Sequence, residues 1–195
     1  MLLEVSVGEA IDKYIILEIK KENITDLYKK SEILKELNSL QSLTLIIEKY
    51  VNYYRYLKHI NKEIWDLTNN IKLLHYTDTN YANLANDIFN LNQSRFRIKN
   101  IFNLLTASNL TEQKSYNSTK CKIVFTSPIS EKISEINYLL TQYDYIYFDM
   151  KHEIQLTDIF NSPTIQYCEA DIKFTETVIL DDYRLNTELK DIYKN

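Results

Sequence analysis

The chain has 195 residues, of which 45% are hydrophobic and 26% charged, so it is long enough and apolar enough to bury a core. Its formal net charge of -4 argues against binding to nucleic acid duplexes, which calls for a basic surface. The single glycine, Gly8, excludes the phosphate loops GxGxxG and GxxxxGK[ST] and leaves almost no glycine for helix C-caps and hairpin turns.

The sequence carries no sign of export, membrane insertion or metal binding. Its first twelve residues include Glu4, Glu9 and Asp12, unlike a signal peptide, and no apolar run approaches the ~18 residues of a membrane helix. Cys121 and Cys168 are far apart and lack the spacing of metal ligands, and the three histidines are isolated. We therefore expect a cytoplasmic protein that makes no membrane contact and holds no metal and no cofactor.

The first predicted helix begins at Ser6-Val7-Gly8-Glu9, which has the form of a capping box with Ser6 as N-cap. Three isoleucines then recur at four-residue spacing, which predicts an amphipathic helix over residues 7–22. They are Ile11, Ile15 and Ile19. Residues 23–26 should end this helix, and Thr25 or Asp26 can cap the next one.

Residues 27–75 contain neither proline nor glycine and carry two heptad series of apolar residues. One series runs from Ile33 to Tyr54 and the other from Leu43 to Leu74, and their exchange near residues 38–42 predicts either a helix break or a rotation of the buried face. A third series runs from residue 81 to residue 105. Since the connections are short, we expect an antiparallel helical bundle or coiled-coil hairpin with no strand between residues 27 and 105.

The pattern changes after the polar stretch at residues 108–120. Residues 122–126 and 145–149 have the length and composition of strands, and Ser127 can cap a helix between them. Such a unit favours a right-handed parallel crossover. Residues 164–168 and 174–180 are further predicted strands. The predicted fold class is α+β, with a helical domain at residues 1–116 and a small α/β domain with a polar tail at residues 117–195.

Three groups of residues resemble a known family. They are Val5-Ser-Val-Gly-Glu9 with Ile11-Asp-Lys13 and Ile16-Leu-Glu-Ile-Lys20; Asn61 with Ile64-Trp-Asp66; and Leu91-Asn92, Arg95, Ile98-Lys99, Asn103 and Glu112-Gln-Lys-Ser-Tyr116. Over about residues 3–116 the sequence resembles a family of conserved hypothetical proteins, a domain of unknown function, found in bacteria and in large DNA viruses. The resemblance supports the helical prediction and implies no activity. Members sometimes occur beside surface-polysaccharide and glycosyltransferase genes, which hints at glycan assembly.

The most unusual feature of the sequence is the presence of charged residues within apolar faces. On a helical wheel, Asp12 and Glu18 fall within or beside the buried arc, and Arg95 occupies a core position with Asn92 and Lys99 at its margin. Because buried charges are rare unless paired, we expect Arg95 to meet Asp12 or Glu18 across the bundle. The commoner role of such a pair is to fix helix register, and the alternative is a polar pocket that binds an anionic ligand.

A second candidate site lies at the carboxyl ends of the predicted parallel strands, where ligands bind in open α/β sheets. Ser127 follows the first strand, at a helix N-terminus that could hold a phosphate. Asp149 and His152 follow the second strand and could act as an acid–base pair. Ordinary capping and loop polarity is the commoner explanation for such residues. No motif in the sequence supports nucleophilic catalysis.

Two functions are compatible with these features. The first is an interaction or scaffold protein whose helical half self-associates to form a homo-oligomer or binds a protein partner, because long heptad seams can expose more apolar surface than one chain covers. The alternative is an enzyme, or an accessory protein of glycan assembly, that binds a phosphate- or sugar-nucleotide-type ligand. The candidate ligand-binding residues are Asp12, Glu18, Asn92, Arg95, Lys99, Ser127, Asp149 and His152.

Overall fold

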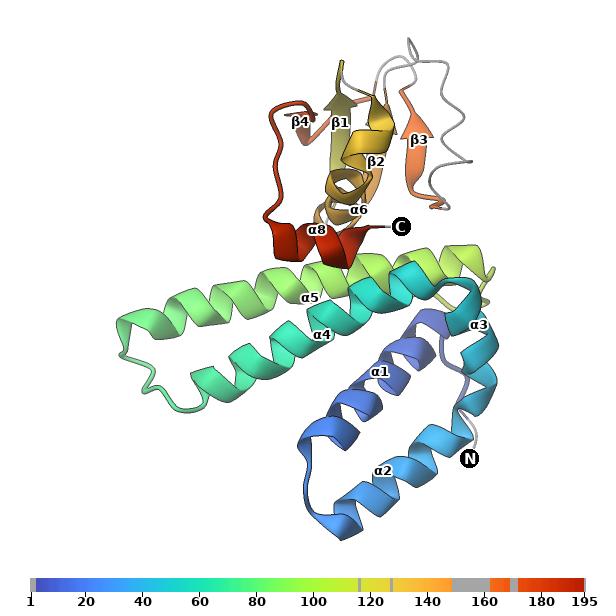
Figure 1. Ribbon diagram of the computed structural model, residues 1–195, viewed down its shortest axis with the longest axis vertical. Coiled ribbons are helices and arrows are strands. Elements are labelled where there is room, and N and C mark those ends of the chain that lie inside the picture. Colours follow the sequence, from blue (N-terminus) through green and yellow to red (C-terminus); the bar gives the residue numbers. More distant parts are fainter. Residues whose placement is uncertain (1–2, 116, 127, 149–161, 169–171, 195) are drawn as a thin grey trace.

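The computed structural model of the chain, which describes residues 3–115, 117–126, 128–148, 162–168 and 172–194, has a helical half and an α/β half (Figure 1). The helices of the first half are α1 (Val7–Asn23), α2 (Leu27–Ser39), α3 (Thr44–Lys49), α4 (Val51–Ile71) and α5 (Thr79–Leu105), with a 3-10 turn at Gln41–Leu43. Helices α4 and α5 form a long antiparallel hairpin, and α1 packs against both of them while α2 packs against α1.

The helix starts follow the predicted capping residues. Ser6 Oγ accepts a hydrogen bond from the backbone N–H of Glu9 at 3.2 Å, and Asp26 caps α2 by accepting from the N–H of Lys29 at 2.8 Å. Within the described part of residues 27–105 there is no strand, as predicted. None of the helices in the described ranges combines the length and the apolarity that a bilayer crossing requires.

The helical stretch is interrupted twice between residues 27 and 75. The predicted change near residues 38–42 is a true break, because α2 ends at Ser39 and a 3-10 turn follows. A second break at Tyr50 (φ -122°, ψ 43°) separates α3 from α4. The heptad series from Leu43 to Leu74 passes through this break without a change of spacing. The heptad spacing of apolar residues therefore indicates which side of each helix is covered, but it does not indicate where one helix ends and the next begins.

The α/β half is a four-stranded parallel sheet with the order β3-β2-β1-β4, which confirms the predicted fold class. The strands lie close to the predicted runs: β1 (Lys120–Val124), β2 (Tyr145–Phe148), β3 (Ile165–Tyr167) and β4 (Glu176–Ile179). Between β1 and β2 the chain forms a 3-10 turn, Ile129–Lys132, followed by α6 (Ile133–Gln142). The predicted polar tail contains a further helix, α8 (Thr187–Tyr193).

Helix α8 joins the two halves of the molecule. It packs on α6 and on α4, while α6 itself packs on α5 (Figure 1). The hydroxyl of Tyr56 donates to the backbone carbonyl of Tyr193 at 3.1 Å, and the side chain of Asn137 donates to the same carbonyl at 2.8 Å. Apolar side chains of both halves belong to one continuous buried cluster. Both sides of the predicted boundary at residue 116 therefore share one core.

Helix α5 ends in a Schellman turn that is built without glycine. The N–H of Ser108 donates to the carbonyl of Asn103 at 2.9 Å, and the N–H of Ala107 donates to that of Leu104 at 3.3 Å. Ala107 has a φ of 47°, a left-handed conformation that glycine usually occupies. This type of helix end therefore forms in a chain with one glycine, with Ala107 at the position that glycine usually occupies.

Candidate functional site

Two of the charged residues that the sequence places within apolar faces, Asp12 and Arg95, meet between α1, α4 and α5. Asp12 of α1 is 1% exposed, and its Oδ1 accepts a hydrogen bond from Arg95 Nε of α5 at 2.8 Å. Its second oxygen accepts from Arg95 Nη2, so the pair is bidentate. Asn61 Nδ2 of α4 donates to Asp12 Oδ1 at 2.9 Å. The sequence predicts that Arg95 meets Asp12 or Glu18, and the structure shows that its partner is Asp12. Asn61 is a third partner that the sequence patterns did not reveal.

Arg95 lies at the edge of the core. Its side chain is 24% exposed, and its Nη1 donates to Asn92 Oδ1 at 3.4 Å. The hydrogen bond to Asp12 raises the pKa of Arg95 and outweighs the opposite effect of burial. Of the five N–H donors of a guanidinium, these contacts with Asp12 and Asn92 use three, so the group can still bind a ligand from its exposed edge.

Lys99 and Glu18 lie in separate ion-pair clusters. Lys99, one turn further along α5, donates to Glu9 Oε2 at 2.6 Å and to Glu112 Oε2 at 2.9 Å. Burial lowers the pKa of Lys99, but these two carboxylates raise it by more. Glu18 accepts from the hydroxyl of Tyr54, and Lys58 Nζ lies 3.5 Å from it. Burial, together with this carboxylate, raises the pKa of Tyr54.

Of the eight predicted ligand-binding residues, the five that the structure describes divide into three sets. Asp12, Asn92 and Arg95 form one network, while Lys99 and Glu18 belong to two others. The residues of the predicted second site lie outside the described residues: they are Ser127, Asp149 and His152.

The N-terminus of α1 is fully engaged by α5 and the turn that follows it. The N–H of Gly8 donates to Asn103 Oδ1 at 2.7 Å, and that of Val7 donates to Ser108 Oγ at 3.1 Å. A Cβ atom at Gly8 would lie 2.2 Å from the carbonyl oxygen of Lys99. Gly8 is therefore required by the close approach of two helices, and this helix N-terminus keeps no free N–H for an anion.

A cavity of about 240 Å³ opens beside the Asp12–Arg95 pair, between α1, α4 and α5. Its walls are mainly apolar, and two cations, Arg95 and Lys72, lie at its lining. Trp65 and Asn61, which belong to the segments that carry the family resemblance, also line it. In the sequence, only the family resemblance draws attention to Trp65 and Asn61, because their spacing matches no known binding motif.

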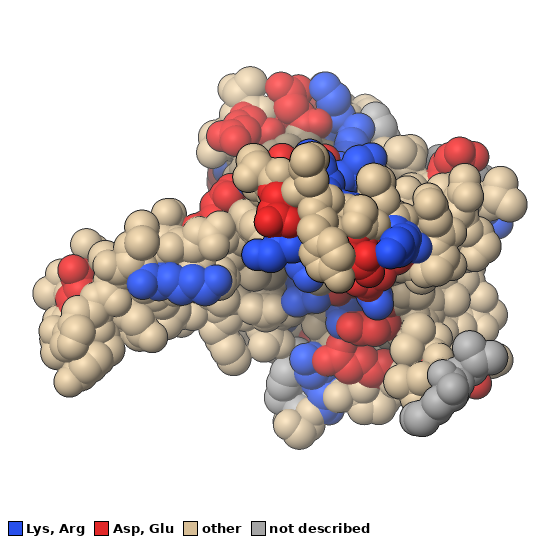
Figure 2. All heavy atoms as spheres, turned by 90° about the horizontal axis from the view of Figure 1, so that it is seen from below, with Lys and Arg blue, Asp and Glu red and all other residues tan. Residues whose placement is uncertain are grey.

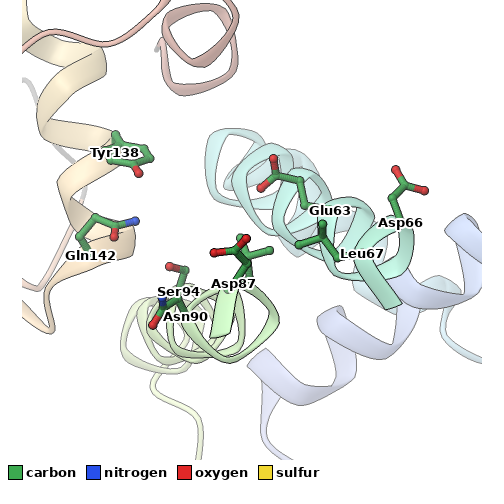
Figure 3. A pocket seen from close by; sticks show the side chains of 9 residues that line it. Glu63, Asp66, Leu67, Asp87, Asn90, Ser94, Tyr138 and Gln142 are labelled. Atoms are coloured by element: carbon green, nitrogen blue, oxygen red, sulfur yellow. The ribbon is translucent and has the colours of Figure 1, made fainter. Parts of the chain in front are cut away.

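A larger cavity of about 640 Å³ lies on another side of the hairpin, between α4, α5 and α6 (Figure 3). Figure 3 shows Glu63 and Asp66 on α4 and Asp87 on α5, with Tyr138 and Gln142 of α6 across the opening. Asp66 already pairs with Lys62, which is not among the lining residues, at 2.9 Å. In the described part of the chain no group of histidine, cysteine and acidic side chains is arranged to hold a metal ion.

The family resemblance holds beyond the residues that suggested it. A family model described as a family of unknown function (DUF6165) matches residues 1–137, which include the helical half, β1 and the first part of α6. The predicted match, over about residues 3–116, was shorter. No curated protein and no solved structure matches the chain. Because the family model covers more than half of the sequence, the chain belongs to the DUF6165 family of unknown function.

Proposed function

We propose that this protein is a helical interaction protein that self-associates through the end of its α4–α5 hairpin. We define the hairpin tip as residues 64–91, the part that extends away from α6 and α8 in Figure 1. The proposal rests on one observation: the buried apolar core ends part of the way along the α4–α5 hairpin. The buried apolar cluster is contacted by Ile64 and Leu91, but the seam residues further out do not belong to it: Leu67, Ile71, Leu74, Tyr81, Leu84 and Ile88.

These outer seam residues are only partly buried, although each of the two helices covers one side of the other. Three further apolar side chains of the tip are largely exposed: Leu73 is 85%, Tyr76 74% and Phe89 61% exposed. Large apolar side chains that stay exposed on one projecting element favour an interaction site there.

A second copy of the same chain is the occupant that best fits this surface. The tip carries only four charged residues, Asp66, Lys72, Asp78 and Asp87, and the projecting arm in Figure 2 is mostly tan with scattered blue and red atoms. Two identical faces with few charges can meet around a two-fold axis with little repulsion. Two antiparallel hairpins that pack in this way form a four-helix bundle, which buries both seams.

The experiment is to measure molar mass by light scattering over a series of protein concentrations. We expect the wild-type chain to become dimeric as the concentration rises, and Phe89→Glu to stay monomeric at concentrations where the wild type is dimeric. Because Phe89 is mostly exposed within one chain, its replacement should leave helicity unchanged. Asn38→Glu adds the same charge at an exposed position of α2, outside the hairpin tip, and should still dimerise. A wild-type chain that is monomeric at every concentration would contradict the proposal.

A second candidate function is the binding of a phosphate- or sugar-nucleotide-type ligand, as an enzyme or an accessory protein of glycan assembly. The observation that favours it is the cavity beside Arg95, where Lys72 adds a second cation. A thermal-shift screen against nucleotide sugars and sugar phosphates tests this function, because a ligand that binds only the folded state raises Tm. A screen in which no compound changes Tm would remove it.

A further inference from the structure

We infer that the 240 Å³ cavity between α1, α4 and α5 binds a small ring compound that carries one phosphate or carboxylate group. In this binding mode the ring lies against Trp65, and the anionic group lies between Lys72 and the exposed edge of Arg95. The inference rests on the second candidate function. Five residues that line the cavity, among them Trp65 and Lys72, belong to the hairpin tip, so its test is made at concentrations where the chain is monomeric. The inference states which part of a larger ligand the cavity can hold, namely one ring with one anionic group.

The size of the cavity limits the ligand to one ring. Sites for drug-sized ligands usually enclose roughly 300–1,000 Å³, and this cavity is smaller. At about 30 Å³ per water molecule, its volume corresponds to about eight waters. A whole sugar nucleotide would therefore extend into solvent, whereas a single ring with one substituent fits inside.

The lining of the cavity favours a ligand with an apolar or aromatic face. Ile16 and Ile19 of α1 and Ile64 of α4 line it together with Trp65, and these apolar side chains supply most of its surface, although five polar residues also contribute. The indole of Trp65 offers a flat face for stacking against a ring. This arrangement of an apolar wall with a small number of charged groups is typical of small-molecule sites.

The charges at the cavity favour an anion. Lys72 forms no ion pair with any described residue, so its charge is available to a ligand. Arg95 is held in place by Asp12, and the two charges of that pair cancel. Asp12 is buried and does not line the cavity, and with Lys72 the three groups leave an excess of one positive charge there. Since the bidentate pair fixes the guanidinium before any ligand arrives, its remaining N–H donors are already oriented.

The test uses the emission of Trp65, which reports directly on this cavity because it is the only tryptophan in the chain. We would titrate the full chain with phenyl phosphate, glucose 1-phosphate, benzoate, inorganic phosphate and the neutral analogue benzyl alcohol. Phenyl phosphate or benzoate should change the emission with a Kd at least about tenfold lower than that of benzyl alcohol. The Kd values of phenyl phosphate and benzoate together identify the preferred anionic group. The Kd values of phenyl phosphate and glucose 1-phosphate together identify the preferred ring.

Two matched variants locate the anion. Lys72→Gln should raise the Kd for the best anionic probe at least about fivefold, because it removes a charge-assisted contact. Lys29→Gln removes the same charge from an exposed position of α2, which does not line the cavity, and should leave the Kd unchanged. Equal binding of anionic and neutral probes, or equal losses in the two variants, would overturn the inference.

The outcomes also separate this inference from the broader function. A compound that raises Tm without changing the Trp65 emission binds elsewhere, which would overturn the inference and keep the second candidate function. If no probe changes the emission and no nucleotide sugar or sugar phosphate raises Tm, both are wrong.

Discussion

The two ends of the α4–α5 hairpin carry the same heptad pattern and have different surroundings. At the base, Ile98 and Phe102 are completely buried, because α1 packs against one side of the hairpin and α6 and α8 against another. At the tip, Leu84 and Ile88 occupy equivalent seam positions and remain partly exposed. A heptad pattern therefore identifies the apolar side of a helix, while the neighbouring elements determine how much of that side is removed from water.

The largest effect is expected at the base, from Arg95→Met. This substitution leaves Asp12 buried without its cation, which should lower the free energy of unfolding by about 3–5 kcal/mol. Chemical denaturation of the purified variant measures the loss. A loss below about 1 kcal/mol would mean that water or another group satisfies Asp12.

Rescue of that variant depends on Asn61 as well as on Asp12. The double variant Asp12→Leu/Arg95→Met removes both charges but leaves Asn61 Nδ2 without its acceptor, which costs about 1–3 kcal/mol. Adding Asn61→Leu should therefore recover more stability than the double variant does. If the double variant is already as stable as the triple variant, the Asn61 contact contributes nothing.

The contribution of apolar burial to stability at the base and at the tip can be compared directly by truncating one large aliphatic side chain to alanine at each end. Ile98→Ala should cost about 2–5 kcal/mol, because it leaves a cavity in a closed core. Leu84→Ala should cost less in a dilute sample, because its side chain is already partly exposed. If the tip dimerises, the cost of Leu84→Ala should rise with protein concentration, which denaturation at two concentrations detects.

Gly8→Ala should destabilise the protein although alanine is the better helix former. The intrinsic gain in the helix is at most about 1 kcal/mol. The added Cβ would lie 2.2 Å from the backbone oxygen of Lys99, so α1 and α5 must separate, and overpacking of this kind costs about 1–3 kcal/mol. A fall in Tm is the expected result, with Lys21→Ala on the exposed side of the same helix as the control. An increase in Tm would show that the two helices move apart easily.

The smallest effect is an increase in stability from Ala107→Gly. Alanine in the left-handed conformation costs roughly 1–2 kcal/mol, which glycine avoids. The greater freedom of glycine in the unfolded chain offsets part of this gain. We therefore expect the free energy of unfolding to rise by about 1 kcal/mol or less, as measured by denaturant titration. A decrease would indicate that the Ala107 methyl group makes stabilising contacts.

The sequence predicts most of the helical half and part of the site for identifiable reasons. The start of α1 follows from Ser6 and Glu9, and the Asp12–Arg95 pair follows from charges that fall on apolar faces. A helical wheel could not choose between Asp12 and Glu18, because it gives the direction of a side chain and not its height along the neighbouring helix. Asn61 was missed because an amide within a polar helix resembles any surface residue until its partner is known.

Other features depend on contacts between distant parts of the chain. The break at Tyr50 leaves no trace in the heptad spacing, and the hydroxyl of that residue donates to the carbonyl of Leu105, 55 residues away. The helix at residues 187–193 has a polar sequence apart from Leu189, Ile192 and Tyr193, and only its packing on α4 and α6 shows that it belongs to the core. Such features need the tertiary structure, because local spacing contains no information about them.

The position of α8 in the chain has a consequence for the order in which the protein folds during synthesis. The hydrogen bond between Tyr56 and Tyr193 joins residues that are 137 positions apart. At a translation rate of roughly 5–20 residues per second, about 7–27 seconds pass between the synthesis of these two residues. During that interval the face of α4 that α8 will cover remains open to solvent. A nascent chain of this protein therefore exposes an aromatic helix face that the finished protein hides, and we expect chaperones that bind apolar segments to recognise it there.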